Sequence, residues 1–229
     1  MARTAVKRRA PRGRFITFEG GEGSGKSTQI RRLAESLEAD GIPTLVTREP
    51  GGTPGAEVLR HLVLSGMGKL FGADLESMLF AAARDDHVQR VIAPALAEGV
   101  WVLCDRFADS TRVYQGKLGK VDPKLLDALE RVTIGDLRPD LTLVLDVPVE
   151  VGLQRATARR GAETADRFEA EGVAFHQRLR EAYREIVREN PDRCVLVDAD
   201  ADAETVAARI REVIKTRLPR PRAARRTPR

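Results

Sequence analysis

The chain has 229 residues, which is enough for one sizeable core and short for two. Its contents of hydrophobic residues, 42%, and of charged residues, 32%, are typical of a globular protein that works in water. No uninterrupted apolar run approaches the length of a membrane-spanning helix, and the basic N-terminus lacks the apolar core of a signal peptide. We therefore expect a cytoplasmic protein without a membrane partner.

The formal net charge of +5 comes from the two ends of the chain. Residues 1–14 and residues 217–229 each hold six basic side chains and no acidic one, which leaves 27 basic against 34 acidic residues elsewhere. We expect residues 1–13 and 217–229 to be disordered basic tails around one domain, residues 14–216. Attraction of the tails to nucleic acid would be weak and salt-sensitive, so we expect no specific nucleic-acid binding.

The elements of this domain follow one another as alternating strands and helices. Apolar, β-branched runs predict strands at residues 15–18, 43–47, 100–104, 141–147 and 194–197, and helical periodicity predicts helices at residues 28–37, 56–64, 75–97, 122–132, 149–159, 169–188 and 203–215. Residues 66–73 are expected to form a loop, and residues 107–120 loop and helix fragments. The alternation predicts an α/β fold, a doubly wound five-stranded parallel sheet flanked by helices, with ligands at the carboxyl ends of the strands.

The two cysteines, Cys104 and Cys194, lie in the third and fifth of these predicted strands. No partner spacing for a metal site or a catalytic thiol accompanies either of them. We expect two reduced, buried thiols.

A phosphate-binding motif stands between the first strand and the first helix. The segment Gly20-Gly21-Glu22-Gly23-Ser24-Gly25-Lys26-Ser27 fits G-x-x-x-x-G-K-[ST] without a gap, and Thr28 begins the helix. The glycines let successive N–H groups face one anion, and the positive end of the helix dipole adds to the same point. Lys26 is placed for the β- and γ-phosphates. A glycine-rich turn with a solvated lysine is the simpler alternative, but the strand, loop and helix occur in the required order and predict a P-loop fold that binds a nucleoside triphosphate.

Asp105 and Arg106 follow the third apolar strand, where a P-loop fold places its acidic metal residue. A carboxylate there can hold Mg²⁺ together with the Ser27 hydroxyl. By position alone, a solvated aspartate at a strand end is an equally good interpretation of Asp105.

Arginines recur at the predicted ligand edge of the sheet, and they are Arg48, Arg84, Arg106, Arg155, Arg159, Arg160 and Arg167. Phosphoryl transfer needs donors that neutralise charge on the equatorial oxygens while water is excluded. Residues 159–168 are a compact basic segment between two helices, which taken alone would be a solvated surface. Together with a P-loop, they predict a short lid that closes over the site.

At this point the chain resembles the thymidylate kinase family of the nucleoside monophosphate kinase group, from Phe15 to Lys215. The matching segments are Phe18-Glu19-Gly20, Gly25-Lys26-Ser27, Thr47-Arg48-Glu49-Pro50-Gly51-Gly52-Thr53, Leu79-Phe80-Ala81-Ala82-Ala83-Arg84, Asp105-Arg106-Phe107, Ser110-Thr111, Tyr114-Gln115-Gly116, Arg138-Pro139-Asp140-Leu141 and Asp166-Arg167-Phe168-Glu169. Many proteins share the P-loop, whereas the Arg-Glu-Pro-Gly-Gly-Thr segment after the second strand is far more specific.

The resemblance implies phosphorylation of dTMP to dTDP by ATP with Mg²⁺, in the synthesis of dTTP. On the donor side, it implies that residues 20–28 hold ATP, that Arg155 lies on adenine, and that Ser27 and Asp105 hold the metal. The residues implied in catalysis are Lys26, Arg48, Arg106, Arg159, Arg160 and Arg167.

On the acceptor side, the resemblance implies a dTMP pocket. Glu22 would accept a hydrogen bond from the 3′-hydroxyl, Arg48 and Arg106 would hold the phosphate, and Phe80 would stack on thymine. Arg84 would donate to thymine O4, Thr111 would face the N3 edge with Ser110 beside it, and Tyr114 would lie where a ribose 2′-hydroxyl would project. Without the surrounding matches, Phe80 and Tyr114 would be ordinary packing residues.

Two departures from the family pattern concern the subtype. The P-loop interior has no arginine, and the basic charge stands in the lid, as in the bacterial subtype. Asp-Arg-Phe replaces the commoner Asp-Arg-Tyr or Asp-Arg-His, which affects one polar contact. The resemblance also implies a homodimer, for which the helices at 56–64 and 75–97 could supply the interface.

Three other functions fit parts of the sequence. A kinase of the same fold could act on dUMP, CMP or a free deoxynucleoside. A GTP-dependent switch is disfavoured because Gly119-Lys120-Val121-Asp122 has glycine in the first position of the [NT]-K-x-D pattern that reads guanine. A nucleic-acid-dependent ATPase would need the basic tails.

Overall fold

The computed structural model describes residues 12–160 and 167–219. The predicted tails therefore lie almost wholly outside the described residues, as do residues 161–166 of the predicted lid and the side chain of Arg160. Within the described part, α9 runs to Arg217 and the buried Leu218 belongs to the core, two residues past the boundary expected at 216.

Five parallel strands form one sheet in the order β2-β3-β1-β4-β5. They are β1 (Phe15–Glu19), β2 (Thr44–Arg48), β3 (Trp101–Asp105), β4 (Leu141–Asp146) and β5 (Cys194–Asp198). β1 and β4 are buried along most of their length, as near-continuous apolar runs require when helices cover both faces. The predicted α/β fold with its five parallel strands is confirmed.

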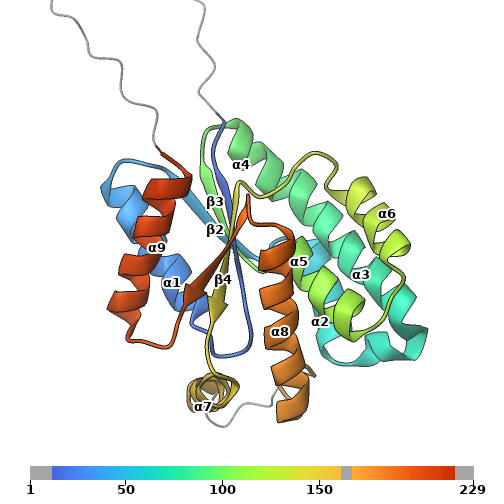
Figure 1. The fold of residues 1–229 in the computed structure, drawn as a ribbon. Coiled ribbons are helices and arrows are strands. Elements are labelled where there is room, and N and C mark those ends of the chain that lie inside the picture. The colour runs from blue at the N-terminus through green and yellow to red at the C-terminus, as the bar shows by residue number, and fades with distance from the viewer. Residues whose placement is uncertain (1–11, 161–166, 220–229) are drawn as a thin grey trace, which may run out of the picture.

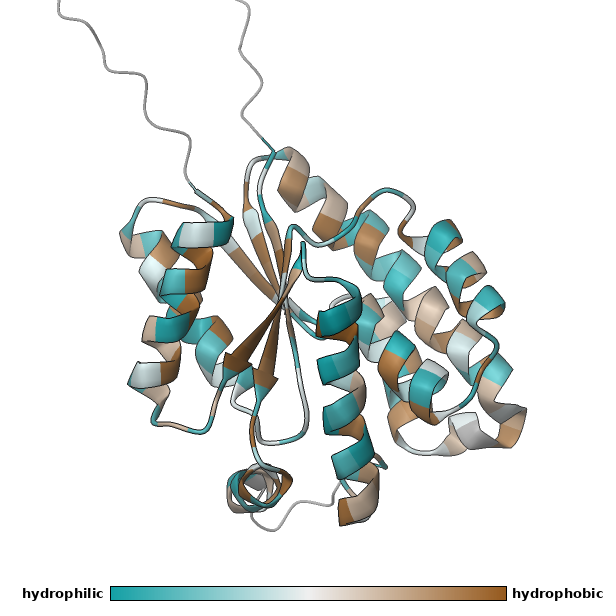
Figure 2. Cartoon of the chain, in the orientation of Figure 1, coloured by the Kyte–Doolittle hydropathy of each residue, from teal (hydrophilic) through white to brown (hydrophobic). Residues whose placement is uncertain are grey.

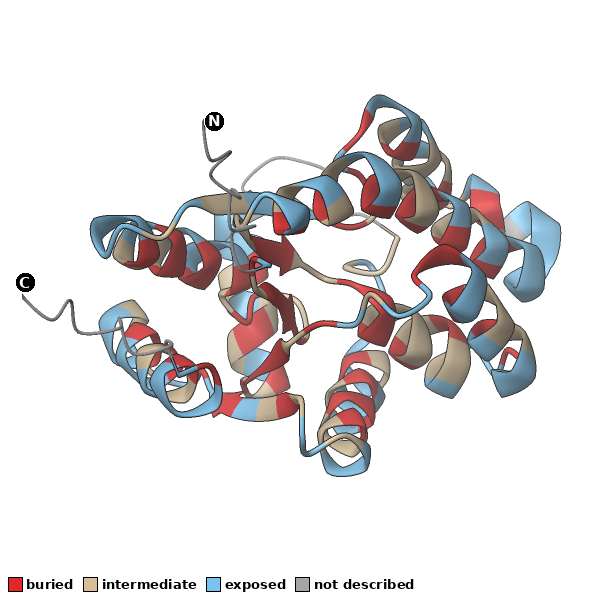
Figure 3. Cartoon of the chain, turned by 90° about the horizontal axis from the view of Figure 1, so that it is seen from above, coloured by how far each residue is buried: buried red, intermediate tan, exposed pale blue. Residues whose placement is uncertain are grey.

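Helices cover the two faces of this sheet in two layers (Figure 1). One layer consists of α1 (Lys26–Ala39) and α9 (Ala203–Arg217), and the other contains α2 (Pro54–Leu64), α3 (Gly72–His87), α4 (Ala93–Ala97), α5 (Ala108–Thr111), α6 (Pro123–Thr133) and α8 (Val173–Glu189). α7 (Val149–Arg160) lies beyond the carboxyl ends of the strands (Figure 1). Brown, apolar strands stand between helices whose outward faces are largely teal (Figure 2), and buried residues line the strands and the inward faces of the helices (Figure 3).

Apolar side chains fill the space on each side of the sheet. Against α1 and α9, the core is built from residues such as Ile16, Leu33, Leu143 and Ile210. Against α4 and the helical turns before it, Phe15 meets Phe107 edge-on, with ring centroids 4.8 Å apart. Both cysteines are free and buried in their strands, as expected.

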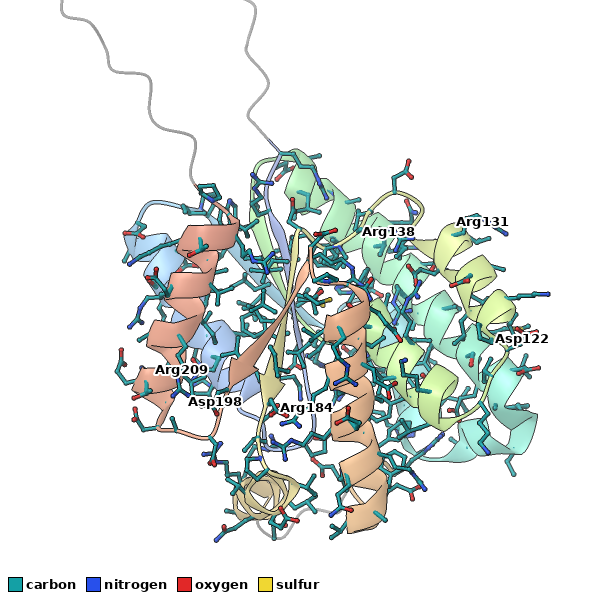
Figure 4. The ribbon with its side chains drawn as sticks, in the orientation of Figure 1. Asp122, Arg131, Arg138, Arg184, Asp198 and Arg209 are labelled. Carbon is teal, nitrogen blue, oxygen red and sulfur yellow. The ribbon has the colours of Figure 1, made fainter. Side chains whose placement is uncertain are left out.

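Ion pairs at the ends of β4 and β5 attach helices to the ligand edge of the sheet (Figure 4). Asp146 accepts from Arg180 at 2.7 Å and from Arg184 at 2.7 Å, both in α8. Asp198 lies 2.8 Å from Arg209 of α9. These contacts place α8, and the segment before it, next to the P-loop.

Three local expectations are wrong. The expected loop 66–73 contains a 3₁₀ turn, Met67–Phe71. The helix expected at 75–97 begins at Gly72 and is interrupted by a π segment, Val88–Ile92, just before Pro94, whose missing N–H breaks the regular bonding pattern. α8 begins at Val173, not near Glu169, because Gly172 is extended and residues 167–170 form turns. Within residues 107–120, where loop and helix fragments were expected, α5 is followed by a second π segment, Arg112–Leu118.

Candidate active site

A cleft of about 410 Å³ opens at the carboxyl edge of the sheet. The P-loop, the ends of β2 and β3, α3, α5 and residues 168–169 surround it. The predicted site residues that line it are Glu22, Gly23, Ser24, Gly25, Lys26, Ser27, Thr28, Arg48, Phe80, Arg84, Asp105, Arg106, Ser110, Thr111, Tyr114 and Arg159. Gly20, Gly21, Arg155 and Arg167 do not line it.

The P-loop has the backbone of an anion site. Gly23 and Gly25 adopt φ of 65° and 92°, which side chains rarely tolerate, and a Cβ at Gly23 would lie 1.9 Å from the carbonyl oxygen of Gly152 in α7. The Lys26 ammonium donates to the carbonyls of Gly20 and Gly21, at 3.1 and 3.0 Å, and so folds back over the loop. Burial and the nearby Arg106 charge lower the pKa of Lys26. An anion at the loop would relieve both effects.

Ser27 and Asp105 meet beside the loop, although 78 residues separate them. Pairing of β1 with β3 brings Phe18 opposite Asp105, and the Ser27 hydroxyl donates to the Asp105 carboxylate at 2.9 Å. A hydroxyl and a carboxylate are hard oxygen ligands of the kind that Mg²⁺ prefers, and this ion keeps waters and substrate phosphates as its other ligands. The described residues contain no cluster of three or more acidic, histidine or cysteine side chains that could hold a metal ion.

Arg106 stands at the centre of the cleft with a left-handed backbone, φ 68°. Its guanidinium donates to Glu22 at 2.5 Å and to the Tyr183 hydroxyl at 3.2 Å, and it lies 5.2 Å from the centre of the Tyr114 ring. Burial tends to raise the pKa of Glu22, but the charges of Arg106 and Lys26 outweigh burial and lower it. Glu22 is therefore an anionic hydrogen-bond acceptor beside a cation that can bind phosphate.

Behind Arg106 lies a buried carboxylate that sequence reasoning missed. Glu19 accepts from the N–H groups of Phe107 and Ser110, at 2.8 and 3.2 Å, and interacts with the Ser110 and Tyr183 hydroxyls at 2.6 and 3.0 Å. Burial, followed by the negative charge of Asp109, raises the pKa of Glu19 to about 7. Its place at the end of β1, just before the P-loop, was the available signal.

The opposite wall of the cleft contains Phe80, Arg84 and Thr111. Arg84 donates to Glu49 at 2.7 Å, to the Thr111 hydroxyl at 3.0 Å and to the Phe107 carbonyl at 3.2 Å. Glu49 also contacts His87, a residue that sequence reasoning missed although it lies one turn after Arg84 on the same helix.

Arg48 lines the same cleft from the end of β2 and is half exposed. Its guanidinium donates to Glu57 of α2 at 2.9 Å, and the same carboxylate oxygen accepts from the Gly52 N–H at 3.0 Å. The Gly52 bond, with the charge of Arg48, lowers the pKa of Glu57 against a modest effect of burial.

The lid arginines separate in space. Arg159, at the end of α7, lines the cleft and donates to Glu169 at 3.0 Å. Arg167 pairs with the buried Glu76 of α3, with one bond at 2.9 Å, and lies 4.4 Å from the centre of the Phe168 ring. Phe168 packs edge-on against Tyr114, with ring centroids 4.9 Å apart, and both rings line the cleft. The predicted contact of Arg167 with the transferring phosphate stays a prediction.

Arg155 lies on α7 outside the cleft. Its guanidinium donates to the carbonyls of Ala199 and Ala201, after β5, at 3.0 and 3.4 Å. The predicted contact with adenine would therefore lie over the segment between β5 and α9, beside the P-loop.

The fold and the cleft define a P-loop kinase of small nucleotides, with an anion site beside an aromatic and arginine-lined pocket for a second ligand. The family model described as thymidylate kinase matches residues 18–210. The chain belongs to the thymidylate kinase family.

Individual relatives agree with the family match over nearly the whole chain. A thymidylate kinase of Nitrobacter winogradskyi is 70% identical over 210 residues, which cover 92% of this chain and 91% of the relative. One of Bradyrhizobium diazoefficiens is 66% identical over 218 residues, 95% of this chain and 96% of the relative. The crystal structure of thymidylate kinase from Ehrlichia chaffeensis superposes with a TM-score of 0.72 at 32% identity, covering 89% of this chain and 100% of that one.

Proposed function

We propose that this cleft transfers the γ-phosphoryl group of ATP to dTMP, giving dTDP and ADP for dTTP synthesis. The observation that supports it best is Arg106, which lies between the P-loop and the second pocket while bonded to Glu22 of the loop. A cation in that position can contact both the donor and the acceptor phosphates. The acceptor phosphate is itself the nucleophile, so positioning and charge neutralisation suffice without a strong general base.

On the donor side, the loop amides and Lys26 bind the β- and γ-phosphates. The Lys26 ammonium leaves the carbonyls of Gly20 and Gly21 when a phosphate offers a stronger, charged acceptor. Ser27 and Asp105 hold Mg²⁺, which when bound offsets negative charge on the phosphate oxygens. Arg159 and Arg160, at the end of α7, approach the transferring phosphate when residues 159–168 close.

On the acceptor side, Arg48 and Arg106 bind the dTMP phosphate, and Glu22 accepts from the 3′-hydroxyl. Phe80 stacks on thymine while Arg84 and Thr111 meet its polar edge, where O4 accepts and N3–H donates. Tyr114, which contacts Arg106 and Phe168, would lie where a ribose 2′-hydroxyl would project and so disfavour ribonucleotides.

We further propose that the enzyme is a cytoplasmic homodimer. Val58, Leu70, Phe71, Leu75 and Met78 expose apolar side chains on α2, the adjoining 3₁₀ turn and α3, which pack against one another. A patch of this kind commonly marks an interface. Two buried, unpaired thiols suit a reducing compartment, and none of the described helices is long and apolar enough to span a membrane.

The test is coupled ADP release from MgATP with dTMP, dUMP, dCMP, dGMP, dAMP and thymidine. We expect turnover to be strongest on dTMP. Turnover strongest on another monophosphate would retain the kinase chemistry and contradict the base pocket. Binding of nucleoside triphosphate without turnover on any acceptor would contradict the proposed reaction.

A further inference from the structure

Arg84 is held from several sides in the base pocket, and its orientation depends on a buried carboxylate. The side chains of Arg84 and Glu49 are 6% and 4% exposed, and Arg84 Nε donates to Glu49 Oε2 at 2.7 Å. A buried guanidinium needs such a counter-charge. The remaining contacts of Arg84 are with Thr111, the Phe107 carbonyl and the Phe107 ring at 5.3 Å, which belong to α5 and the residue just before it. Glu49 thus supplies the counter-charge of Arg84 and the charged bond among those that orient its guanidinium in the cleft.

Glu49 is itself positioned by His87, whose side chain has no exposed surface. The second oxygen of the carboxylate, Oε1, lies 3.2 Å from His87 Nδ1. On the far side of the ring, Nε2 lies 2.7 Å from the Thr47 hydroxyl. Since a carboxylate paired with arginine can only accept, we assign the proton to Nδ1, and the Thr47 hydroxyl donates to Nε2. Both ring nitrogens of His87 and both carboxylate oxygens of Glu49 then have a hydrogen-bond partner.

The loop after β2 closes over this histidine. A Cβ at Gly52 would lie 2.5 Å from His87 Nε2 and 2.9 Å from the Thr47 hydroxyl oxygen, and Gly52 has φ 91°. The same glycine donates its N–H to Glu57, which binds Arg48. His87 therefore lies beneath the loop that begins at Arg48 and Glu49, and it packs against the buried Glu49 carboxylate.

We propose that His87 is a positioning residue for base selection: by fixing Glu49, it aims Arg84 at the oxygen that thymine and uracil present and cytosine lacks. This inference rests on the proposed function, because it assigns a cause to the selectivity of the same pocket. Cytosine presents an amino donor where thymine presents O4, so a donor guanidinium in a fixed orientation favours dTMP over dCMP.

The test compares His87→Leu with His87→Asn. Asparagine places its amide nitrogen where Nδ1 stands and can still donate to Glu49, whereas leucine fills space and donates nothing. For His87→Leu we expect the ratio of kcat/KM for dTMP over dCMP to fall about tenfold, the KM for dTMP to rise, and the KM for ATP to change by less than about twofold. His87→Asn should retain most of the ratio.

The proposal would be overturned if a folded His87→Leu variant lost kcat/KM equally for dTMP and dCMP, so that the ratio of the two stayed at the wild-type value. Should His87→Leu fail to fold, the same kinetic ratio can be compared between Thr47→Val and Thr47→Ser. Valine removes the hydroxyl that donates to His87 Nε2, whereas serine keeps a hydroxyl at this position. We expect the ratio to fall for valine only, and equal ratios for the two would reject the assignment. Absence of dTMP turnover in the wild-type enzyme would instead reject the proposed function.

Discussion

At the scale of single residues, the cleft depends on charged groups that are held out of water. Lys26, Glu22 and Arg106 are each buried or partly buried; burial and the Arg106 charge lower the pKa of Lys26, and the charges of Arg106 and Lys26 lower the pKa of Glu22 against the effect of its burial. Water screens such charges poorly, so single substitutions here act on catalysis much more than an exposed ion pair would.

Lys26→Ala should lower kcat by about a hundredfold or more, because the ammonium stabilises charge that develops on the transferring phosphate. The buried position of Lys26 requires a stability control, which thermal unfolding supplies. Steady-state ADP release measures the effect. A variant with normal melting temperature and normal turnover would sink the phosphoryl-transfer mechanism.

Glu19 should make stability fall as the pH rises from about 4.5 to about 7. The pKa of the carboxyl is 4.5 in its ordinary state and about 7 in the fold, so between these values the folded protein holds a proton that the unfolded chain has released. Glu19→Gln imitates the protonated acid and removes this dependence. We expect the free energy of unfolding of the variant, relative to wild type, to increase by on the order of 3 kcal/mol between pH 5 and pH 8.

Chemical denaturation of both proteins across this pH range checks the prediction. The variant and the wild type share all other titrating groups, so the contributions of those groups cancel when the two free energies of unfolding are subtracted. A difference that stays constant from pH 5 to pH 8 would contradict a raised pKa for Glu19.

At the scale of elements, the P-loop is positioned by a backbone contact with α7. Gly152 has an ordinary helical conformation, but a Cβ there would lie 2.6 Å from the Glu22 carbonyl oxygen and 3.3 Å from Val147. The reciprocal contact, from Gly23 to the Gly152 carbonyl, is closer still. The two glycines let loop and helix approach backbone to backbone.

Gly152→Ala should therefore raise the KM for ATP about fivefold or more, although alanine in a helix interior is ordinarily favourable by about 1 kcal/mol. The added methyl group forces α7 away from the loop. Gln154→Ala, on the exposed face of the same helix, is the matched control and should leave the KM unchanged. A Gly152→Ala enzyme with wild-type KM and a higher melting temperature would show that the loop tolerates the displacement.

At the scale of the whole molecule, the exposed apolar patch on α2, the 3₁₀ turn and α3 lies on the helices that also bear the base pocket and Glu76. Leu70 is 84% exposed and Val58 71%, which is unusual for large apolar side chains that gather on neighbouring elements. A homodimer formed there would bury the patch and steady α3, the helix that bears Phe80, Arg84 and His87.

If the proposed dimer forms, Leu70→Glu should convert it to a monomer, because burying one carboxylate per subunit in an apolar interface is costly. Sedimentation velocity at micromolar concentration measures the mass. The control is Leu196→Glu. Leu196 is also an exposed apolar residue, but it belongs to β5 and not to the proposed interface, so this substitution should leave the measured mass unchanged. A wild-type monomer, or a Leu70→Glu dimer, would reject this interface.

The sequence by itself determined the order of strands and helices and the P-loop, and its resemblance to one family indicated the arginines and aromatic residues of the cleft. These features are local: a strand, a glycine-rich turn and a helix follow one another directly, and a motif such as Arg-Glu-Pro-Gly-Gly-Thr is contiguous. The ends and interruptions of helices were predicted less well. Pro94 and Gly172 act on backbone geometry, which the periodicity of apolar residues does not describe.

Only the tertiary structure decided which partner each charged residue has. Glu49 and Arg84 are 35 residues apart, Arg167 and Glu76 are 91 apart, and Glu19 and Tyr183 are 164 apart. No spacing in the chain indicates such pairs, since each arises where elements from different parts of the sequence meet at one edge of the sheet. Burial at that edge then makes each arginine depend on a nearby carboxylate, so the tertiary contacts separate arginines that line the cleft, such as Arg106, from those that pair outside it, such as Arg167.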